Sequence, residues 1–324
     1  MPTYDISVIV ATYHPDLKKL LTTISQTIKQ KDIKCEVIIS DDGSDVDWFN
    51  EIREYFKEKC FSDYRLIKNK DNVGTVKNIY NSVCEAKGKY VFCTSPGDYL
   101  HDEMTLCDFF NYSEKSNSSI VFGNAVYYSV DTENKPEIHS VTKPPFWPEL
   151  FNSKSSFKKE TAFFFGNYIV GATIFRERIA FKKQLETLMP YCKYVEDNTS
   201  VAYALLEKER IQYYDRSIVF YEYGVGISTS KDNKWAKILE SEFCAFFEYL
   251  NRKYPNNKPI AAAYHHYKYE HGLKEKISRI VRYPTVCFVQ FVNGFRKKVI
   301  AQNADAEKKI ISEVINEKLY SSDV

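Results

Sequence analysis

The alternation of apolar strands with amphipathic helices in the N-terminal third of the chain is what most constrains its fold. Residues 5–13 (DISVIVATY), 35–39 (CEVII) and 90–94 (YVFCT) are continuous apolar runs of the kind found in strands covered on both faces. A shorter run, YRLI, lies between the last two. The first run is followed by apolar residues at helical spacing, at Leu17, Leu20, Leu21, Ile24 and Ile28. This pattern predicts an α/β fold whose sheet is Rossmann-like, mostly parallel and flanked by helices.

Polar residues follow each predicted strand. They are Thr12, Tyr13, Asp41, Asp42, Asn72 and the segment Ser95 to Asp98. In a parallel sheet the carboxyl ends of neighbouring strands meet at one edge, and ligands bind beyond that edge. An acid there can accept hydrogen bonds from a nucleotide base or a ribose hydroxyl. The DDGS segment that begins at Asp41 is also compatible with an ordinary strand-to-helix turn.

Two predicted helix starts carry charged residues. NVGTVKN places Gly74 and Lys77 at the start of a helix, which suits phosphate binding but also suits a plain capped helix. YVEDNTSVAYALL places Glu196 and Asp197 at the start of another helix. Acids in a first turn also stabilise a helix through its dipole, so these two residues alone leave both interpretations open.

The composition excludes several classes of protein. The 324 residues carry a net charge of +2, which gives no global field for nucleic acid, and we expect no nucleic-acid partner. Eight cysteines are scattered without a C-x-x-C pair, which favours a reducing compartment. The N-terminus does not resemble a signal peptide, and no apolar run approaches the roughly 18 residues of a membrane span. We therefore expect a cytoplasmic protein.

Taken in order, four segments resemble glycosyltransferase family 2, a group of nucleotide-sugar enzymes with the GT-A fold. The segments are SVIVATYHPDLKKLLTTISQTIKQ, EVIISDDGSD, KNKDNVGTVKNIYNSVCEAKGKYVFCTSPGDYL and YVEDNTSVAYALL. The resemblance covers roughly residues 4–230. It implies a GT-A domain over residues 1–231, with a nucleotide-sugar-binding half at 1–119 and an acceptor-binding half at 120–231. Residues 232–324 are expected to form a helical C-terminal extension.

The resemblance also implies a role for each site residue. Ala11 and Tyr13 would line the base pocket, Asp42 would contact the uracil of a UDP-sugar, and Asp41 would support that turn. Asn72 and Lys77 would lie near the ribose or the diphosphate, where the family often has Arg at the position of Lys77. Asp197, or else Glu196, would be the base that deprotonates the acceptor hydroxyl.

The chain departs from the family at its metal motif. The Ser95 to Asp98 segment occupies the place of the D-x-D motif, but Ser95 and Gly97 stand where the two acids are expected. Asp98 matches the acid that follows the motif and is the one candidate ligand for Mg²⁺ or Mn²⁺. The later loop, YEYGVGISTS, has no His where the family often has one. We therefore expect weak or substrate-completed metal binding, or neutralisation of the leaving diphosphate by cations such as Lys77.

The C-terminal residues 274–300 combine basic clusters with an apolar centre. Lys and Arg flank the stretch YPTVCFVQFVNGF. This pattern suits a helix lying on an anionic membrane, at the inner face of the plasma membrane, and it equally suits a helix packed on the catalytic domain.

The sequence as a whole predicts an inverting glycosyltransferase. It would move a sugar from a nucleotide sugar, with UDP favoured, to a growing bacterial polysaccharide such as an O-antigen or capsule chain on a lipid carrier. The alternative is a non-catalytic GT-A domain that binds a nucleotide or a partner enzyme. A nucleotidyltransferase ranks last, because ATYHPDLKK lacks a Gly-rich phosphate loop after the first strand.

Overall fold

A ten-stranded sheet with helices on both faces forms the centre of the molecule. The computed structural model describes residues 2–133, 135–142, 148–164, 169–226, 233–269, 272–294, 299–300 and 304–320. The strand order is β10-β7-β6-β8-β4-β1-β2-β3, and β9 pairs with both β5 and β6.

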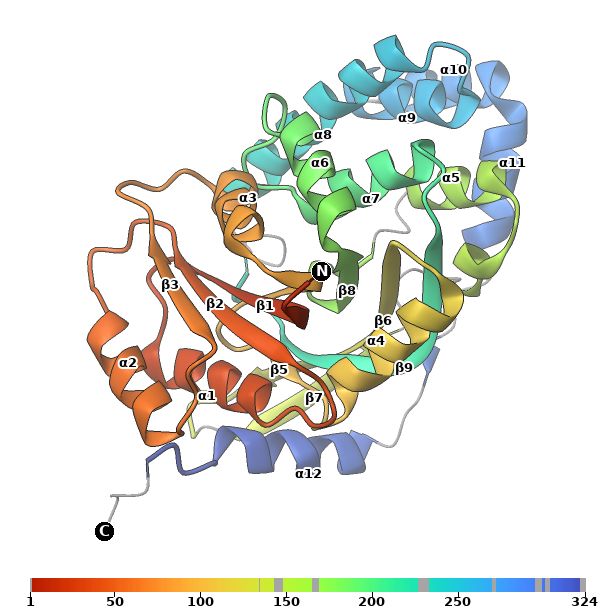
Figure 1. Cartoon of the computed structure of the whole chain (residues 1–324). Helices are drawn as coiled ribbons and strands as arrows, with labels where there is room; N and C mark the ends of the chain where they lie inside the picture. The colour runs from red at the N-terminus through yellow and green to blue at the C-terminus, as the bar shows by residue number, and fades with distance from the viewer. Residues whose placement is uncertain are drawn as a thin grey trace.

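The N-terminal half of the sheet is parallel. It consists of β1 (Tyr4–Thr12), β2 (Cys35–Asp41), β3 (Tyr64–Lys68) and β4 (Gly88–Thr94), with β1 between β2 and β4 and with β3 outside β2. The helices between these strands are α1 (Leu17–Ile28), α2 (Phe49–Glu58) and α3 (Thr75–Glu85). Figure 1 shows α1 and α2 on one side of this sheet and α3 on the other. The α/β prediction for this region is therefore correct.

Alternating strand residues explain why both faces are covered. Val8 and Val10 pack with the apolar side chains of α1 and α2, whereas Ile9 packs with those of α3. Because successive side chains of a strand point to opposite faces, a run without polar residues has to be buried on both.

The second half of the sheet is mixed. Its strands are β5 (Tyr99–Leu100), β6 (Ile120–Val130), β7 (Pro136–Thr142), β8 (Ile174–Glu177) and β9 (Ile211–Glu222). β6 runs parallel to β9 and antiparallel to β7 and β8. The accompanying helices are α4 (Thr105–Ser116), α5 (Ser156–Phe164), α6 (Arg178–Leu188) and α7 (Asp197–Leu206), and short 3₁₀ turns lie at Pro148–Asn152 and Gly171–Thr173.

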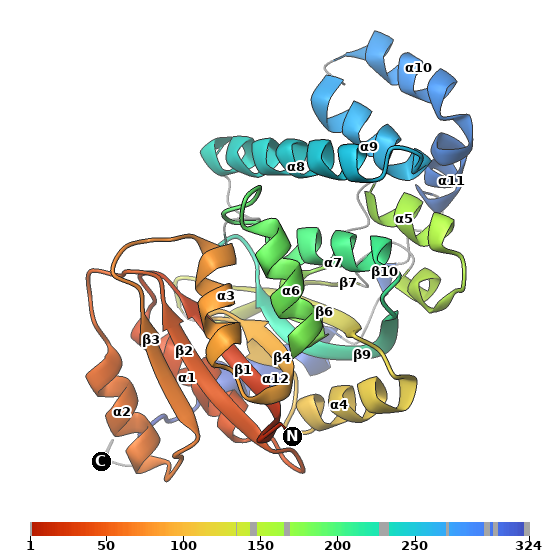
Figure 2. The same cartoon turned by 45° about the horizontal axis from the view of Figure 1, so that its top comes forward.

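A group of helices follows at one end of the molecule (Figure 2). It contains α8 (Asn233–Lys253), α9 (Lys258–Tyr269), α10 (Leu273–Arg282) and α11 (Pro284–Gly294). Phe246, Phe247 and Leu250 of α8 are buried in the same apolar cluster as the side chains of α3, α6 and α7. The helices α8 and α9 are therefore packed on α3, α6 and α7.

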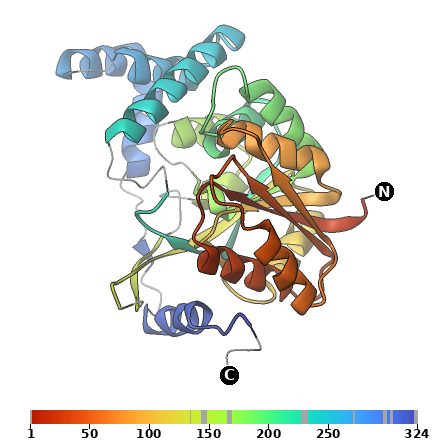
Figure 3. The ribbon, with the colours of Figure 1, turned by 90° about the vertical axis from the view of Figure 1, so that its left-hand side faces the viewer.

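The chain then returns to the opposite side of the sheet. β10 (Val299–Ile300) pairs with β7, and α12 (Ala304–Ile315) lies along β7 and α1, as Figures 1 and 3 show. Ile311, Val314 and Ile315 of α12 are buried against Tyr99 and Tyr128. The sequence pattern predicted helices alone after residue 232, and it did not show β10 or the return of α12. The domain division at residues 231 and 232 stays a prediction.

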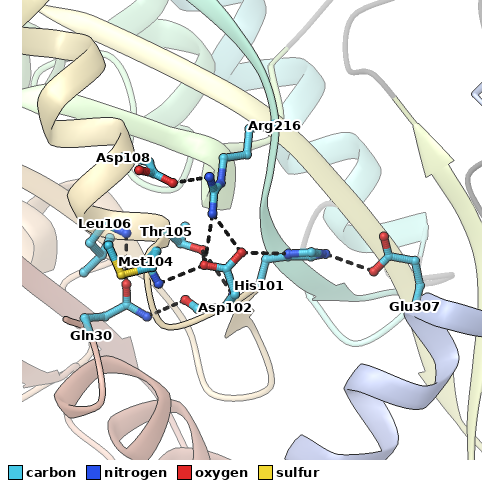
Figure 4. Close-up of polar contacts among 9 residues, drawn as sticks. All are labelled: Gln30, His101, Asp102, Met104, Thr105, Leu106, Asp108, Arg216 and Glu307. Carbon is cyan, nitrogen blue, oxygen red and sulfur yellow. Dashed lines mark hydrogen bonds and ion pairs between the residues drawn. The ribbon is translucent and has the colours of Figure 1, made fainter.

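Polar contacts fix α12 to the sheet domain at both of its ends. The Glu317 carboxylate, just beyond α12, accepts hydrogen bonds from Ser25 and Gln26 of α1. Figure 4 shows the other end, where Nε2 of His101 lies 3.0 Å from the carboxylate of Glu307. Nδ1 of His101 lies 3.4 Å from Asp102, which also binds Arg216 at 2.9 Å.

The charge on His101 makes this contact pH-dependent. Burial opposes the charge, but hydrogen bonds with Asp102 and Glu307 outweigh burial and raise the pKa of His101 to about 9. A folded-state pKa above the ordinary histidine value of 6.5 means that the stabilisation is complete below about pH 6.5. It is lost as the pH rises through about 9.

We expect His101→Gln to destabilise the protein at pH 6 and to do so much less at pH 10. The difference in unfolding free energy between wild type and variant should shrink by about 3 kcal/mol over this range, because the pKa rises from 6.5 to about 9 on folding. Urea denaturation at both pH values measures it. His139→Gln, at an exposed histidine of β7, is the control. A difference that did not depend on pH would contradict the charged His101–Glu307 contact.

Candidate active site

Asp41 builds the turn at the end of β2. Its carboxylate accepts hydrogen bonds from the amide and the hydroxyl of Ser44, at 3.0 and 2.5 Å, and from the hydroxyl of Thr12 at 3.1 Å. Gly43 has φ +80°, and a Cβ there would lie 2.7 Å from the carbonyl carbon of Asp71. The turn therefore requires glycine, and the contacts of Asp41 suit the supporting role that the sequence predicts.

Asp42 holds the loop between β3 and α3. Oδ1 accepts from the side chain of Asn69 at 3.0 Å and from the amide of Val73 at 2.9 Å, and Oδ2 accepts from the amide of Gly74 at 2.9 Å. A carboxylate offers about four acceptor positions, of which three are used here, and Asp42 is 5% exposed. The contact of Asp42 with uracil stays a prediction. The hydrogen bonds show that Asp42 also holds this loop in place.

The other predicted donor-binding residues lie around the same edge. Ala11 is half-buried near the end of β1, and Tyr13 is 53% exposed just beyond it. Asn72 is half-buried in the loop that Asp42 holds. Lys77 is exposed, with Nζ 4.7 Å above the ring of Tyr80.

A cation that sequence reasoning missed lies against this loop. Nζ of Lys193 is 3.5 Å from the carbonyl oxygen of Asn72. Its Cγ occupies the space beside Gly74, where a Cβ would come within 2.3 Å of it. Lys193 stands three residues before Glu196, so its spacing to the predicted base is the only signal that could have drawn attention to it.

The loop after β4 turns its acid inward. Ser95 is exposed, whereas Asp98 is 8% exposed and its Oδ1 accepts the amide of Glu222 at 3.3 Å. Burial raises the pKa of Asp98 to about 8, and the Glu222 carboxylate adds to the rise. A buried carboxyl with a raised pKa ionises less readily than an exposed one, and a cation binds the ionised form.

Glu222 and Lys19 form an ion pair beside Asp98 that the sequence analysis did not find. Nζ of Lys19 lies 2.6 and 2.7 Å from the two carboxylate oxygens of Glu222. Oε2 of Glu222 also lies where a side chain at Gly97 would need space, since a Cβ there would be 2.4 Å away. The sequence signal that could have drawn attention to Glu222 is an acid at the end of a strand, as at Asp41.

These contacts fit Mg²⁺ or Mn²⁺ poorly. Glu222 is engaged with Lys19, and the Asp98 carboxyl is buried. Within the described ranges, no three His, Cys, Asp or Glu side chains come together as a metal site. Asp98, which follows the motif position, is turned inward and has little access to a cation at the edge of the sheet. Its role as a metal ligand stays a prediction.

Glu196 and Asp197 stand at the start of α7, and backbone contacts place them at this edge. The carbonyl of Lys193 accepts the amide of Val76 at 3.0 Å, which joins the loop before Glu196 to the start of α3. From the other side, the carboxylate of Glu242 on α8 accepts the amides of Tyr194 and Val195, at 2.9 and 3.2 Å.

The two acids have the electrostatics of a base. Burial raises the pKa of Glu196 to about 7, with a further contribution from Asp197, and burial also raises the pKa of Asp197. The nearby Arg176 acts in the opposite direction on both. A carboxylate whose pKa is closer to neutral accepts a proton from a hydroxyl more effectively than an ordinary one. The arrangement can therefore perform general-base chemistry beside this edge of the sheet.

Comparison with known proteins identifies the family of this chain. The sequence model described as "Glycosyl transferase family 2" matches residues 7–180, which is more than half of the chain. Poly(ribitol-phosphate) beta-N-acetylglucosaminyltransferase TarP of Staphylococcus aureus (strain N315) is 24% identical over 329 residues, covering 97% of this chain and 94% of TarP.

Solved structures share the fold. TarS of S. aureus superposes with a TM-score of 0.56 at 15% identity, over 95% of this chain, which spans 55% of that TarS chain. TarS 1-349 in complex with UDP-GlcNAc gives a TM-score of 0.53 at 16% identity, over 95% and 91% of the two chains. The mannosyltransferase PcManGT from Pyrobaculum calidifontis, in complex with GDP-Man and Mn²⁺, gives 0.52 at 14% identity, over 97% and 90%.

The predictions of a GT-A fold and of a glycosyltransferase are thus confirmed at the level of the family. The matched residues contain the Asp41 turn, the Asp42-held loop and the Ser95 to Asp98 loop, and they end shortly before the acids of α7. The chain belongs to glycosyl transferase family 2.

Proposed function

We propose that this protein is an inverting glycosyltransferase with Asp197 as its base. The observation that carries the proposal is the position of the Glu196–Asp197 pair, which backbone hydrogen bonds join to the loop held by Asp42. The Asp197 carboxylate takes the proton of the acceptor hydroxyl, whose oxygen attacks the anomeric carbon. The bond from that carbon to the diphosphate breaks, and the nucleoside diphosphate leaves with the electron pair.

The proposed donor is a UDP-sugar. Asp42 retains an acceptor position suited to the N–H of uracil, and Tyr13 offers an exposed ring at the same edge. TarS 1-349 forms a complex with UDP-GlcNAc, which makes UDP-GlcNAc the first donor to test.

The proposed acceptor is a growing bacterial surface polymer on a lipid carrier. O-antigen and capsule chains are candidates, and the name of TarP adds poly(ribitol phosphate). The non-catalytic alternative is disfavoured, because a domain that only binds needs no acid pair with raised pKa values.

For the cation, we propose that Mg²⁺ or Mn²⁺ is not held by the protein alone and binds only together with the donor's diphosphate. The support is the buried Asp98 and the engagement of Glu222 with Lys19. Lys193 contacts the loop through the carbonyl oxygen of Asn72, and Lys77 stands in the first turn of α3. Both can offset negative charge on a diphosphate.

Titration of UDP into the full chain tests donor and cation together. We expect UDP to bind in EDTA, with a Kd that changes by less than about tenfold when Mn²⁺ is added, because the buried Asp98 gives a cation little to bind. Binding of Mn²⁺ to the protein in the absence of UDP would contradict the proposal about the cation. Release of UDP from UDP-GlcNAc with each acceptor tests transfer, and absence of UDP binding under both conditions would contradict the proposed donor.

We also propose that α10 and α11 contact an anionic membrane. Leu273, Ile277, Ile280 and Val281 of α10 and Phe288 and Phe291 of α11 are exposed by 52–74%. Arg279 is instead buried in the same helix, with Nη1 2.9 Å from the side chain of Gln290. The apolar face of α10 is therefore turned outward, and we call these six side chains the α10–α11 face.

Basic residues beside this face favour anionic lipid as its occupant. Lys274, Lys276 and Arg282 are exposed on α10. Apolar side chains between basic ones suit the headgroup region of an anionic membrane. Among the described helices, none is long and apolar enough to cross a bilayer. We propose the inner face of the plasma membrane as the surface that these helices contact.

Flotation with vesicles tests this contact. We expect the full chain to float with phosphatidylglycerol vesicles and not with phosphatidylcholine, and Ile277→Glu with Val281→Glu should lower the bound fraction at least about fivefold. Ile179→Glu, at a residue of α6 that is 68% exposed, is the control. Equal flotation of the double variant would contradict the proposal. So would a wild-type oligomer that the double substitution dissociates, because the face would then bind a second copy.

A further inference from the structure

The carboxylate of Glu222 fills the space of the acid that the metal motif lacks at position 97. Gly97 has φ +97°, and a Cβ built on it would collide with Oε2 of Glu222. The next atoms that this Cβ would meet are Cδ of Glu222 and Cδ of Lys19, at 3.5 and 3.6 Å. Gly97 stands where the family has the second acid of its D-x-D motif. A carboxylate from the end of β9 therefore lies where the side chain of that acid would begin.

The cation beside this carboxylate is an ammonium of the chain itself. Nζ of Lys19 lies 2.6 and 2.7 Å from the two carboxylate oxygens of Glu222. Short contacts to both oxygens make a strong, charge-assisted pair. The side chain of Glu222 is 8% exposed and that of Lys19 is 35% exposed. The carboxylate is thus covered, while the lysine side of the pair reaches solvent.

The helix to which Lys19 belongs does not explain its position. Lys19 stands in the first turn of α1, where the helix dipole disfavours a positive charge, and this turn contains no acid. The amide of Lys19 donates to the side chain of Asp16, so capping of the helix uses its backbone and not its ammonium. The contact that compensates the charge of Lys19 is the one with Glu222, 203 positions away.

Neutral contacts hold the same loop from three elements. The amide of Gly97 donates to the hydroxyl of Thr23 on α1 at 3.3 Å, and its carbonyl accepts the hydroxyl of Tyr128 on β6 at 2.6 Å. From β9, the amide of Glu222 donates to Oδ1 of Asp98 at 3.3 Å. Contacts within the protein therefore hold the loop at the motif position.

We propose that the Lys19–Glu222 pair replaces the metal motif, with the carboxylate in place of the missing acid and the ammonium in place of its divalent cation. The proposal rests on the proposed function, because the task of this cation is to offset negative charge on the donor's diphosphate. The ammonium supplies a positive charge at the motif loop without a metal.

The alternative is a partly exposed ion pair that only ties α1 to β9, and such pairs contribute little. The two explanations differ in what Mn²⁺ does once the ammonium is removed. A freed carboxylate offers oxygen ligands to a divalent cation, which can then take over the lost charge. A metal does not restore the function of a simple tie between two elements.

The test compares Lys19→Met with wild type in the full chain, because Met keeps an apolar stem and removes the charge. We expect its Kd for UDP in EDTA to be at least about tenfold weaker than that of wild type. The gain in affinity on adding Mn²⁺ should be at least about tenfold larger in Lys19→Met than in wild type. An affinity that does not fall, or a loss that Mn²⁺ does not reverse, would overturn the proposal.

Two matched variants accompany this comparison. Lys18→Met is the control, because Lys18 is exposed in the same turn of α1, and it should behave as wild type. Lys19→Arg should also stay close to wild type, because a guanidinium can pair with both oxygens of Glu222. A response of Lys18→Met equal to that of Lys19→Met would reduce the effect to general surface charge and would contradict the proposal.

A measurement without donor separates this proposal from the proposed function. Millimolar Mn²⁺ should raise the melting temperature of Lys19→Met by at least about 2 °C more than that of wild type, because the ion binds the freed carboxylate in the folded state. Lys19→Met combined with Glu222→Gln should lose this effect. Equal shifts in all three proteins would overturn the proposal. A shift confined to Lys19→Met in a protein that binds no UDP would support the cation site while refuting the proposed donor.

Discussion

Replacing Asp197 by Asn is expected to lower kcat about 10³-fold while leaving the Kd for UDP within about twofold. General-base catalysis contributes typically 10²–10⁴-fold, and an amide cannot accept the proton of the hydroxyl. Asp197 follows the loop that is hydrogen-bonded to the start of α3. The side-chain amide of the variant should therefore occupy the same place as the carboxylate, beside the loop that Asp42 holds. Release of UDP from UDP-GlcNAc in the presence of acceptor measures the rate, and calorimetry measures the affinity.

Two further variants make this result interpretable. Glu196→Gln should retain more activity than Asp197→Asn, while Glu54→Gln, an exposed acid on α2, should change neither quantity. If Glu196→Gln lost activity and Asp197→Asn kept it, Glu196 would be the base. Retention of full activity by both would remove the pair from the mechanism.

Replacing Asp42 by Ala is expected to weaken UDP binding about 30-fold or more and to destabilise the fold by about 2–4 kcal/mol. The substitution leaves the buried amide of Gly74 and the partly buried amide of Val73 without their acceptor, and each unsatisfied donor costs about 1–3 kcal/mol. The same change removes the acceptor proposed for uracil. Calorimetry with UDP and urea denaturation measure the two effects.

Asp45→Ala is the matched control, because Asp45 stands in the same turn but is exposed. We expect it to leave both quantities close to wild type. If Asp42→Ala lost stability and kept its affinity for UDP, the residue would hold the loop without contacting the base. Unchanged stability would contradict the three hydrogen bonds that Asp42 accepts.

The sequence allowed the N-terminal half of the fold to be predicted because the information there is local. Strands β1, β2 and β4 are apolar runs, and the turn at Asp41 carries its own glycine. The acids of α7 were predicted from their place in the ordered set of segments that resemble the family.

The contacts that sequence reasoning missed join distant positions. Lys19 and Glu222 are 203 positions apart, and no local pattern connects a lysine in the first turn of α1 with the end of β9. Arg176 stands in a short strand whose other residues indicate only a core position. The inward orientation of Asp98 depends on Glu222 as well, so a motif alignment could place the acid but could not show which way it faces.

The exposed apolar face of α10 could not be predicted from the sequence, for a different reason. Its helical periodicity is readable in the sequence, but periodicity does not say which face is covered. Packing of Arg279 against Gln290 of α11 decides this, and it turns Ile277 and Val281 outward.

The position of α12 has a consequence for synthesis of the protein. The hydroxyl of Tyr128 donates to the carbonyl of Gly97 at 2.6 Å, and Tyr128 is in turn covered by Ile311 and Ile315 of α12. β1 starts at residue 4 and α12 at residue 304, so 300 residues separate them. At roughly 5–20 residues per second, a ribosome needs roughly 15–60 seconds for that length. Once residue 197 has been made, the nascent chain contains every predicted catalytic residue, while the apolar cluster behind the Gly97 loop stays uncovered and accessible to chaperones until α12 follows.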